Sequence, residues 1–188
     1  MGSKNTLEPK IILTIDIHSH INIPFIVTTA TNKILTMTHC DKLKSNYKTR
    51  QNCIAKIEQL RQQYNIDTII LEQNKLFIDK IDRHPDPIVL RNILWGFGVK
   101  ITIDDTYHKL VENIIELPNW EWSNKVLNST VKYSIDLYKA HVMSREDISK
   151  EYLDIIEQNN YYKAVCLSES VLWDTLMNKK YLINKGDK

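Results

Sequence analysis

Segment 11–17, IILTIDI, restricts the fold of this chain more than any other stretch, because it is an apolar run with one carboxylate inside it. Side chains on both faces of the extended segment are largely apolar, which is typical of a strand covered on both sides. A carboxylate in such surroundings needs hydrogen-bond donors or a cation close by. Asp16 therefore either accepts backbone hydrogen bonds at the end of a strand or takes part in a metal site.

A second run, 67–72, reads DTIILE and again ends a β-rich apolar stretch in a carboxylate, Glu72. Two buried strands that each carry an acid near the C-terminal end bring both acids to one edge of a sheet, where open α/β sheets bind ligands. A third acid, Glu169, lies in the apolar helical run 161–177. Three converging carboxylates suit hard divalent cations such as Mg²⁺, which serve phosphate chemistry.

The bulk composition indicates one globular domain. The chain has 188 residues, of which 43% are hydrophobic and 26% are charged, and these proportions are ordinary for a domain with a substantial core. We predict a disordered or cloning-derived segment at 1–10, a single domain over 11–180 and a basic tail at 181–188. No apolar run reaches the about 18 residues that a membrane-spanning helix needs, so we expect no membrane partner.

The cysteines and the charge narrow the cellular setting without defining the chemistry. Cys40, Cys53 and Cys166 are odd in number, widely spaced and in no zinc-binding pattern, so we expect a reducing compartment. A net charge of +2 and a pI near 8.3 permit nucleic-acid binding without indicating it. Basic residues cluster in 42–50 and 179–188, either as a solvated surface or as phosphate contacts.

The first half of the chain predicts a sheet that begins antiparallel and continues in parallel. Alternating apolar residues in 21–29 and 33–38 follow the first strand, so the chain opens with a three-stranded antiparallel meander. The polar, basic stretch 41–49 is expected to be a loop. Apolar residues at helical spacing predict an amphipathic helix over 51–65. The strand 68–71 follows directly, and strand–helix–strand favours parallel pairing with the first strand.

The middle of the chain carries an aromatic loop and a strongly apolar helix. Leu76 and Phe77, in the charged segment 75–86, either stack on or wedge between bases or pack into a small satellite core. The helical run 88–97 is so apolar that it is either fully buried or covered by a partner subunit. Two glycines end this run, and the apolar pattern of segment 99–103 predicts the next strand.

Helices are expected to fill the last third of the chain. Segment 104–124 is irregular and contains proline, so we expect it to pack across one end of the sheet. Apolar spacing predicts a helix within 128–140, a second helix that begins at Ser144 as its N-cap, and a last helix over 161–179.

This order of strands, helices and acids resembles the RuvC-type Holliday junction resolvases of the ribonuclease H-like superfamily, particularly the phage and poxvirus branch. The similarity spans Ile11–Met177, and four motifs carry it: ILTIDI with Asp16, TIILEQ with Glu72, VKYSID with Lys132 and KAVCLSES with Glu169. The fold that it implies is α/β, a ribonuclease H-like five-stranded mixed sheet with three antiparallel strands followed by parallel strands, flanked by helices.

Two positions of this chain depart from the pattern of that family. The last motif of the family usually reads K-x-D-D-x-x-D-S, which Lys163 and Ser170 match and which Glu169 fits with Glu in place of the final Asp. Cys166 stands at the position of the expected fourth acid, where some relatives have histidine. His18 stands where relatives often have a glycine that lets the backbone approach the metal site.

The resemblance implies metal-dependent phosphodiester cleavage. It assigns two Mg²⁺ or Mn²⁺ ions to Asp16, Glu72 and Glu169, with the fourth corner filled by Cys166, by a histidine or by water. It assigns Lys132 to the neutralisation of the scissile phosphate. The resemblance therefore predicts a divalent-metal-dependent endodeoxyribonuclease.

The resemblance also implies partners. The substrate would be a four-way DNA junction, which a homodimer resolves by paired symmetric nicks. The DNA-binding positions would be Lys75, Leu76, Phe77, Lys125, Lys132 and Lys139. The dimer interface would include Ile88, Leu94 and Trp95. Such an enzyme works in the cytoplasm or at the nucleoid, in a cell that hosts a virus or phage, or in an organelle.

Three alternatives stay open. Cysteine is a poor Mg²⁺ ligand, so Cys166 is compatible with a degenerate relative that binds branched DNA without cutting it. The pattern also fits another ribonuclease H-like nuclease, such as a transposase-like or flap-cutting enzyme. A mixed α/β interaction domain without DNA activity would fail to bind a junction even at low salt, where phosphate contacts are strongest.

Overall fold

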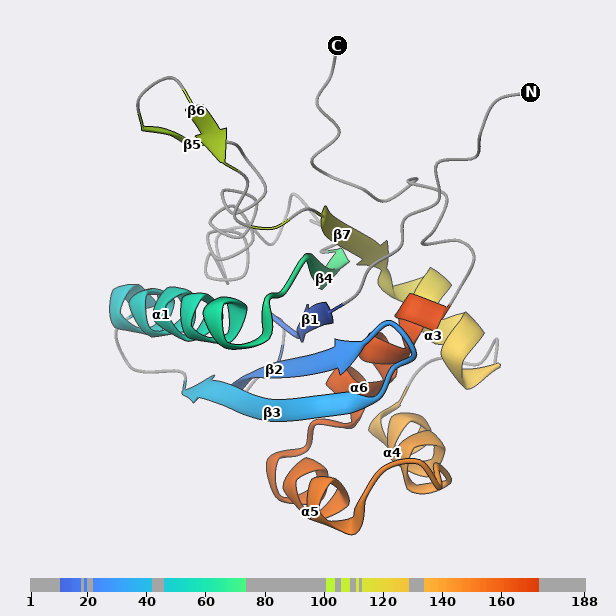
Figure 1. The fold of residues 1–188 in the computed structure, drawn as a ribbon. Coiled ribbons are helices and arrows are strands. Elements are labelled where there is room, and N and C mark those ends of the chain that lie inside the picture. The colour runs from blue at the N-terminus through green and yellow to red at the C-terminus, as the bar shows by residue number, and fades with distance from the viewer. Residues whose placement is uncertain are drawn as a thin grey trace, which may run out of the picture.

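A five-stranded mixed sheet with helices on both faces forms the body of the protein in the computed structural model (Figure 1). The structure describes residues 11–17, 19, 22–41, 46–73, 101–103, 106–108, 111, 113–128 and 134–172. The strand order is β3-β2-β1-β4-β7, and the strands comprise β1 (Ile11–Ile15), β2 (Asn22–Thr29), β3 (Ile34–Asp41), β4 (Thr68–Gln73) and β7 (Asn113–Pro118). The five-stranded sheet that the sequence predicts is thus confirmed.

The direction of the strands also agrees with the prediction. β1 pairs with β2 and β2 with β3 in antiparallel orientation, so the opening meander is confirmed. β1 pairs with β4 and β4 with β7 in parallel orientation. Parallel neighbours must be joined by a crossover, and α1 (Asn46–Tyr64) supplies it between β3 and β4. The carboxyl ends of β1, β4 and β7 therefore meet at one edge of the sheet.

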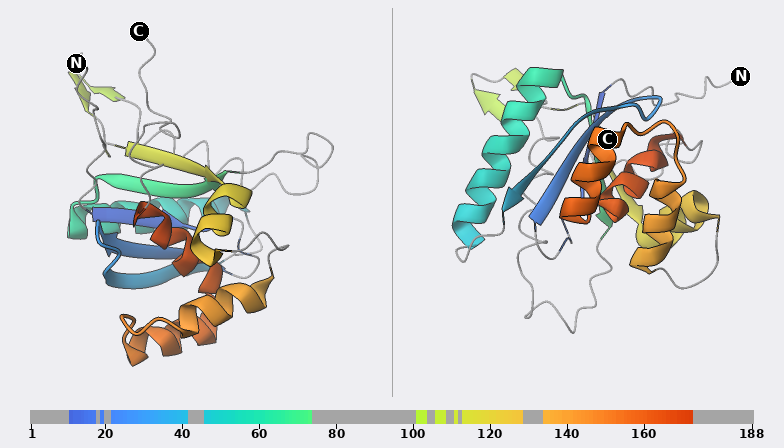
Figure 2. Two further views of the ribbon diagram at one scale, coloured as in Figure 1. Left: turned by 90° about the vertical axis from the view of Figure 1, so that its right-hand side faces the viewer. Right: turned by 90° about the horizontal axis from the view of Figure 1, so that it is seen from below.

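Each face of the sheet carries its own hydrophobic cluster, which explains why the central strands are apolar on both sides. On one face, Cys53, Ile57 and Leu60 of α1 pack against the sheet. The other face is covered by α3 (Asn119–Leu127), α4 (Ile135–Met143), α5 (Lys150–Asn159) and α6 (Tyr162–Ser168), as Figure 2 shows from two further directions. The short 3-10 helix η2 (Glu169–Leu172) continues α6. Among the residues that the structure describes, no helix meets the length and hydropathy that a bilayer span requires.

The prediction that segment 104–124 is irregular is wrong, because the structure describes two strands and the start of a helix in it. Residues 113–118 form β7, the fifth strand, and α3 begins directly after it. The short run NIIELP combines an acid with a proline and so has a weak strand pattern of its own; its pairing with β4 stabilises it. The predicted strand at 99–103 exists as β5 (Ile101–Ile103), but it pairs with β6 (Thr106–His108) in a separate two-stranded sheet.

Helix boundaries differ from the predictions where polar residues end or begin a helix. α1 begins at Asn46, so part of the predicted loop 41–49 is helical. The predicted helix 128–140 is wrong at its start, because Asn128 adopts φ 45° and ends α3. Ser144 caps the C-terminus of α4, and Ser149 is the N-cap of α5, where its side chain accepts a hydrogen bond from a backbone N–H.

Candidate active site

Asp16 and Glu72 lie on neighbouring parallel strands at the same level. Ile15 pairs with Leu71, so the next residues along β1 and β4 are the two acids. Ile15 and Leu71 belong to the hydrophobic cluster under α1, and side chains alternate along a strand, so both acids face the opposite side, under α6. Both are almost fully buried, at 4% and 7% exposure. Two carboxylates this close and this buried require a counter-charge.

Lys163 of α6 supplies that counter-charge. Its ammonium nitrogen Nζ lies 3.0 Å from Glu72 Oε2, 3.1 Å from Glu72 Oε1 and 3.5 Å from Asp16 Oδ1. Asn119 at the start of α3 donates a further hydrogen bond from Nδ2 to Glu72 Oε2 at 2.9 Å. Burial alone would lower the pKa of Lys163, but the charges of Asp16 and Glu72 outweigh it and raise this pKa. The charged form of Lys163 is therefore favoured between the two acids.

Glu169 is held by two other residues, Arg145 and His141. Arg145 Nη1 donates to Glu169 Oε1 at 2.7 Å, and His141 Nε2 lies 2.8 Å from Glu169 Oε2. Arg145 also binds Asp147, and this hydrogen bond lowers the pKa of Asp147. Burial opposes the charge on Arg145, but its bonds to Asp147 and Glu169 raise its pKa overall. Glu169 thus sits at the end of α6 with its charge compensated by the protein itself.

Cys166 lies in the core, one turn before Glu169. It is fully buried, and its thiol donates to the backbone carbonyl of Tyr138 at a Sγ–O distance of 3.9 Å. Burial, together with the nearby charge of Glu169, raises the pKa of Cys166 far above its ordinary value, so the thiol stays protonated. A neutral thiol is a poor ligand for Mg²⁺. The structure thus gives position 166 a packing contact with α4.

The acids fit a divalent cation only in part. In the portion of the chain that the structure describes, no three His, Cys, Asp or Glu side chains gather closely enough to hold a metal ion. Asp16 and Glu72 do fit as a pair, because both are oxygen ligands that already share one cation. Cys166 does not fit, and Glu169 would first have to leave Arg145 and His141.

The structure describes two of the six positions that were predicted to contact DNA, Lys125 and Lys139. On α3, the ammonium nitrogen Nζ of Lys125 lies 3.9 Å from Oε1 of Glu121. Lys139 is exposed on α4, where it pairs with Glu157 and lies over the ring of Tyr162. The remaining predicted positions lie outside the described residues: Lys75, Leu76, Phe77 and Lys132 for DNA, and Ile88, Leu94 and Trp95 for the dimer.

Sequence reasoning assigned no role to four residues of this site. Lys163 was matched only as part of a motif, and its pairing with two strands is a tertiary contact that spacing alone does not reveal. His141 lies in the last turn of α4, whereas Arg145 lies two residues beyond the end of that helix, so helical spacing does not predict that both reach Glu169. Asn119 could not be predicted either, because α3 was not predicted.

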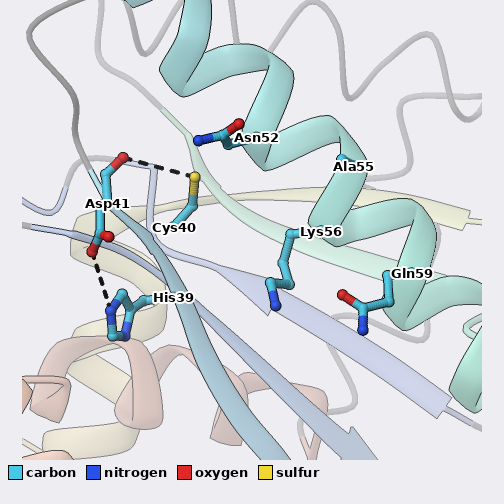
Figure 3. A pocket seen from close by; sticks show the side chains of 7 residues that line it. All are labelled: His39, Cys40, Asp41, Asn52, Ala55, Lys56 and Gln59. Atoms are coloured by element: carbon cyan, nitrogen blue, oxygen red, sulfur yellow. Dashed lines mark hydrogen bonds and ion pairs between the residues drawn. The ribbon is translucent and has the colours of Figure 1, made fainter.

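A separate hollow of about 330 Å³ lies between the end of β3 and α1. Figure 3 shows its lining, with His39 paired to Asp41 at 3.2 Å and the Cys40 thiol directed to the carbonyl of Asp41. Lys56 reaches it from α1. None of the three predicted metal-binding acids lines this hollow. It is therefore distinct from the candidate active site.

Comparison with known proteins supports the fold and leaves the activity open. No family model and no curated protein sequence matches the chain. The solved structure of T. thermophilus RuvC in complex with Holliday junction substrate matches 93% of this chain and 99% of that chain, with 7% identity and a TM-score of 0.55. A second Thermus thermophilus RuvC structure matches 92% and 99%, also with 7% identity, at a TM-score of 0.56. The chain therefore has the fold of RuvC.

Proposed function

We propose that this protein is a metal-dependent, structure-selective endonuclease that cuts four-way DNA junctions. The observation that supports this most is the position of the buried acids Asp16, directly after β1, and Glu72, on the adjacent parallel strand β4. The fold around them matches RuvC over nearly the full length of both chains. A RuvC-like fold alone does not define a reaction, but two buried acids at the carboxyl edge of its sheet are suited to one.

Each residue of the site would have a separate role in phosphodiester hydrolysis. A divalent cation such as Mg²⁺ or Mn²⁺, held by Asp16 and Glu72, would supply the Lewis acid for phosphodiester hydrolysis. Asn119 would orient Glu72 through the hydrogen bond that it already makes. A second ion would need Glu169, released from Arg145. Two ions per site remain part of the proposal.

The RuvC structure that matches this chain was solved in complex with Holliday junction substrate, and it supports the choice of substrate proposed here. We propose branched DNA for this chain too, bound by Lys125 and Lys139, with Lys132 at the scissile phosphate. A homodimer through the run 88–97 would give the paired nicks. We also propose that the protein belongs to the phage and poxvirus branch and works in a reducing compartment.

The test compares two buried acids on neighbouring strands. Glu72→Gln should reduce junction cleavage by about 100-fold or more, because a lost metal ligand removes several kcal/mol of transition-state stabilisation. Glu116→Gln is the matched control, since Glu116 is 5% exposed but faces the α1 side of β7. Junction binding should persist in both variants. Equal cleavage by the two variants would remove Glu72 from the active site.

A second candidate, a relative that binds junctions without cutting them, has one specific observation in its favour. Cys166 is a buried neutral thiol, and the acids already contact Lys163, Arg145 and His141. Cys166→Asp separates the two candidates. Cleavage that appears only in this variant would identify a weakened metal site, whereas binding without cleavage in both proteins would favour the second candidate.

A further inference from the structure

The ammonium group of Lys163 lies between the two acids that a metal ion would need. We infer that Lys163 is a built-in counter-cation for Asp16 and Glu72, so that this site assembles without metal and any divalent ion must displace the lysine. The first half of the inference concerns folding alone. The second half rests on the proposed use of Asp16 and Glu72 as metal ligands.

The geometry of the contact supports one shared cation. Nζ of Lys163 reaches both oxygens of Glu72, at 3.0 and 3.1 Å, and one oxygen of Asp16, at 3.5 Å. An ammonium has three donors, so these three oxygens match its capacity. Asn119 takes a further lone pair of Glu72 Oε2. Both acids therefore contact one ammonium of the protein itself, and Glu72 accepts hydrogen bonds from Lys163 and Asn119.

The charge balance of the site leads to the same conclusion. Asp16 and Glu72 are 4% and 7% exposed, and removal of their shared cation would leave two like charges buried side by side. Arg145 and His141 are engaged by Glu169, on the far side of Cys166 along α6. Among the described residues, Lys163 is the cation that contacts both strand acids.

The position of Lys163 makes it displaceable. Its helix is fixed, because the neighbouring residues Tyr162 and Ala164 are buried and α6 packs on β1 and β2. Its side chain is 25% exposed, so the ammonium has a route to solvent along its flexible four-carbon stem. A divalent ion has more charge than the ammonium and binds carboxylates directly. Metal binding thus exchanges one cation for another without moving the helix.

The test removes the charge and keeps the stem. In Lys163→Met, the melting temperature in EDTA should fall, and Mg²⁺ should restore much of it, because a ligand that binds only the folded state stabilises it. The wild-type protein should shift by less than about 1 °C between EDTA and low-millimolar Mg²⁺. The dissociation constant for Mn²⁺, measured by calorimetry or electron paramagnetic resonance, should be at least about tenfold lower in Lys163→Met. Lys150→Met, an exposed lysine on α5, is the control and should resemble wild type.

Equal Mn²⁺ affinity in Lys163→Met and wild type, with no difference in their response to EDTA, would overturn the inference. If Lys163→Met does not accumulate as folded protein, Asp16→Asn is added to it, which removes one of the two repelling charges. Recovery of folded protein supports the inference, and failure to recover contradicts it.

Failure of this inference is distinguishable from failure of the proposed function. Tight Mn²⁺ binding by Lys163→Met, together with no junction cleavage by the wild type, would leave the inference standing and refute the nuclease. Junction cleavage by the wild type, with unchanged Mn²⁺ affinity in Lys163→Met, would do the reverse.

Discussion

Removal of the Arg145 charge should destabilise the protein measurably. Arg145 and Glu169 are each 13% exposed at the side chain and are joined at 2.7 Å. Arg145→Met keeps most of the apolar stem but leaves Glu169 with His141 as its described partner. Breaking a buried ion pair on one side typically costs about 3–5 kcal/mol, and the residual exposure and His141 reduce our expectation to about 2–3 kcal/mol. For a chain of this size, this corresponds to a fall in melting temperature of about 4–12 °C.

Calorimetry or thermal circular dichroism at neutral pH measures this effect. Lys139→Met is the matched control, because Lys139 also pairs with a glutamate, but at an exposed position of α4 where its loss should matter little. Glu169→Gln added to Arg145→Met should recover much of the lost stability, because the unpaired charge is then gone. A melting temperature of Arg145→Met that equals that of Lys139→Met would refute the reasoning.

Two further predictions concern the core under α4. Burial raises the pKa of Tyr138 to about 12, so the folded protein keeps this proton while the unfolded chain loses it near pH 10. Above pH 10 the unfolded state then binds fewer protons than the folded state, so the free energy of unfolding should fall by about 2–3 kcal/mol as the pH rises from about 10 to about 12. Urea titrations should show a smaller fall in Tyr138→Phe. Identical pH profiles of the two proteins would contradict this prediction. Trp122 is fully buried and stacks on Tyr138 at a centroid distance of 5.8 Å. Trp122→Ala should therefore lower the free energy of unfolding by about 3–5 kcal/mol in the same titrations. A decrease below about 1 kcal/mol would show that the ring is not part of the core.

The sheet was predictable where the sequence pattern is strong on its own. The runs that form β1 and β4 are β-rich, apolar on both faces and bounded by polar residues, so local pattern and tertiary pairing agree. β7 was missed because Glu116 and Pro118 weaken a six-residue strand whose stability comes from pairing with β4. The start of α4 was missed because the left-handed Asn128 interrupts a helical pattern.

The site was predictable only for the residues that the strands carry. Asp16 and Glu72 end parallel strands, and parallel strands bring their ends to one edge whatever the rest of the chain does. The cations were not predictable, because Lys163 and Arg145 reach Glu72 and Glu169, which are 91 and 24 residues away in sequence. Only the packing of α6 and α4 on the sheet determines which cation meets which acid.

The most direct test of the proposed function maps nicks on a synthetic four-way junction. Each strand is end-labelled in turn, and the wild-type protein is compared with Asp16→Asn in Mg²⁺ and in Mn²⁺. We predict paired nicks at symmetric positions in opposing strands for the wild type, and binding without nicks for Asp16→Asn. Nicks that persist in Asp16→Asn, or a wild-type protein that binds the junction and never cuts it, would contradict the proposed nuclease.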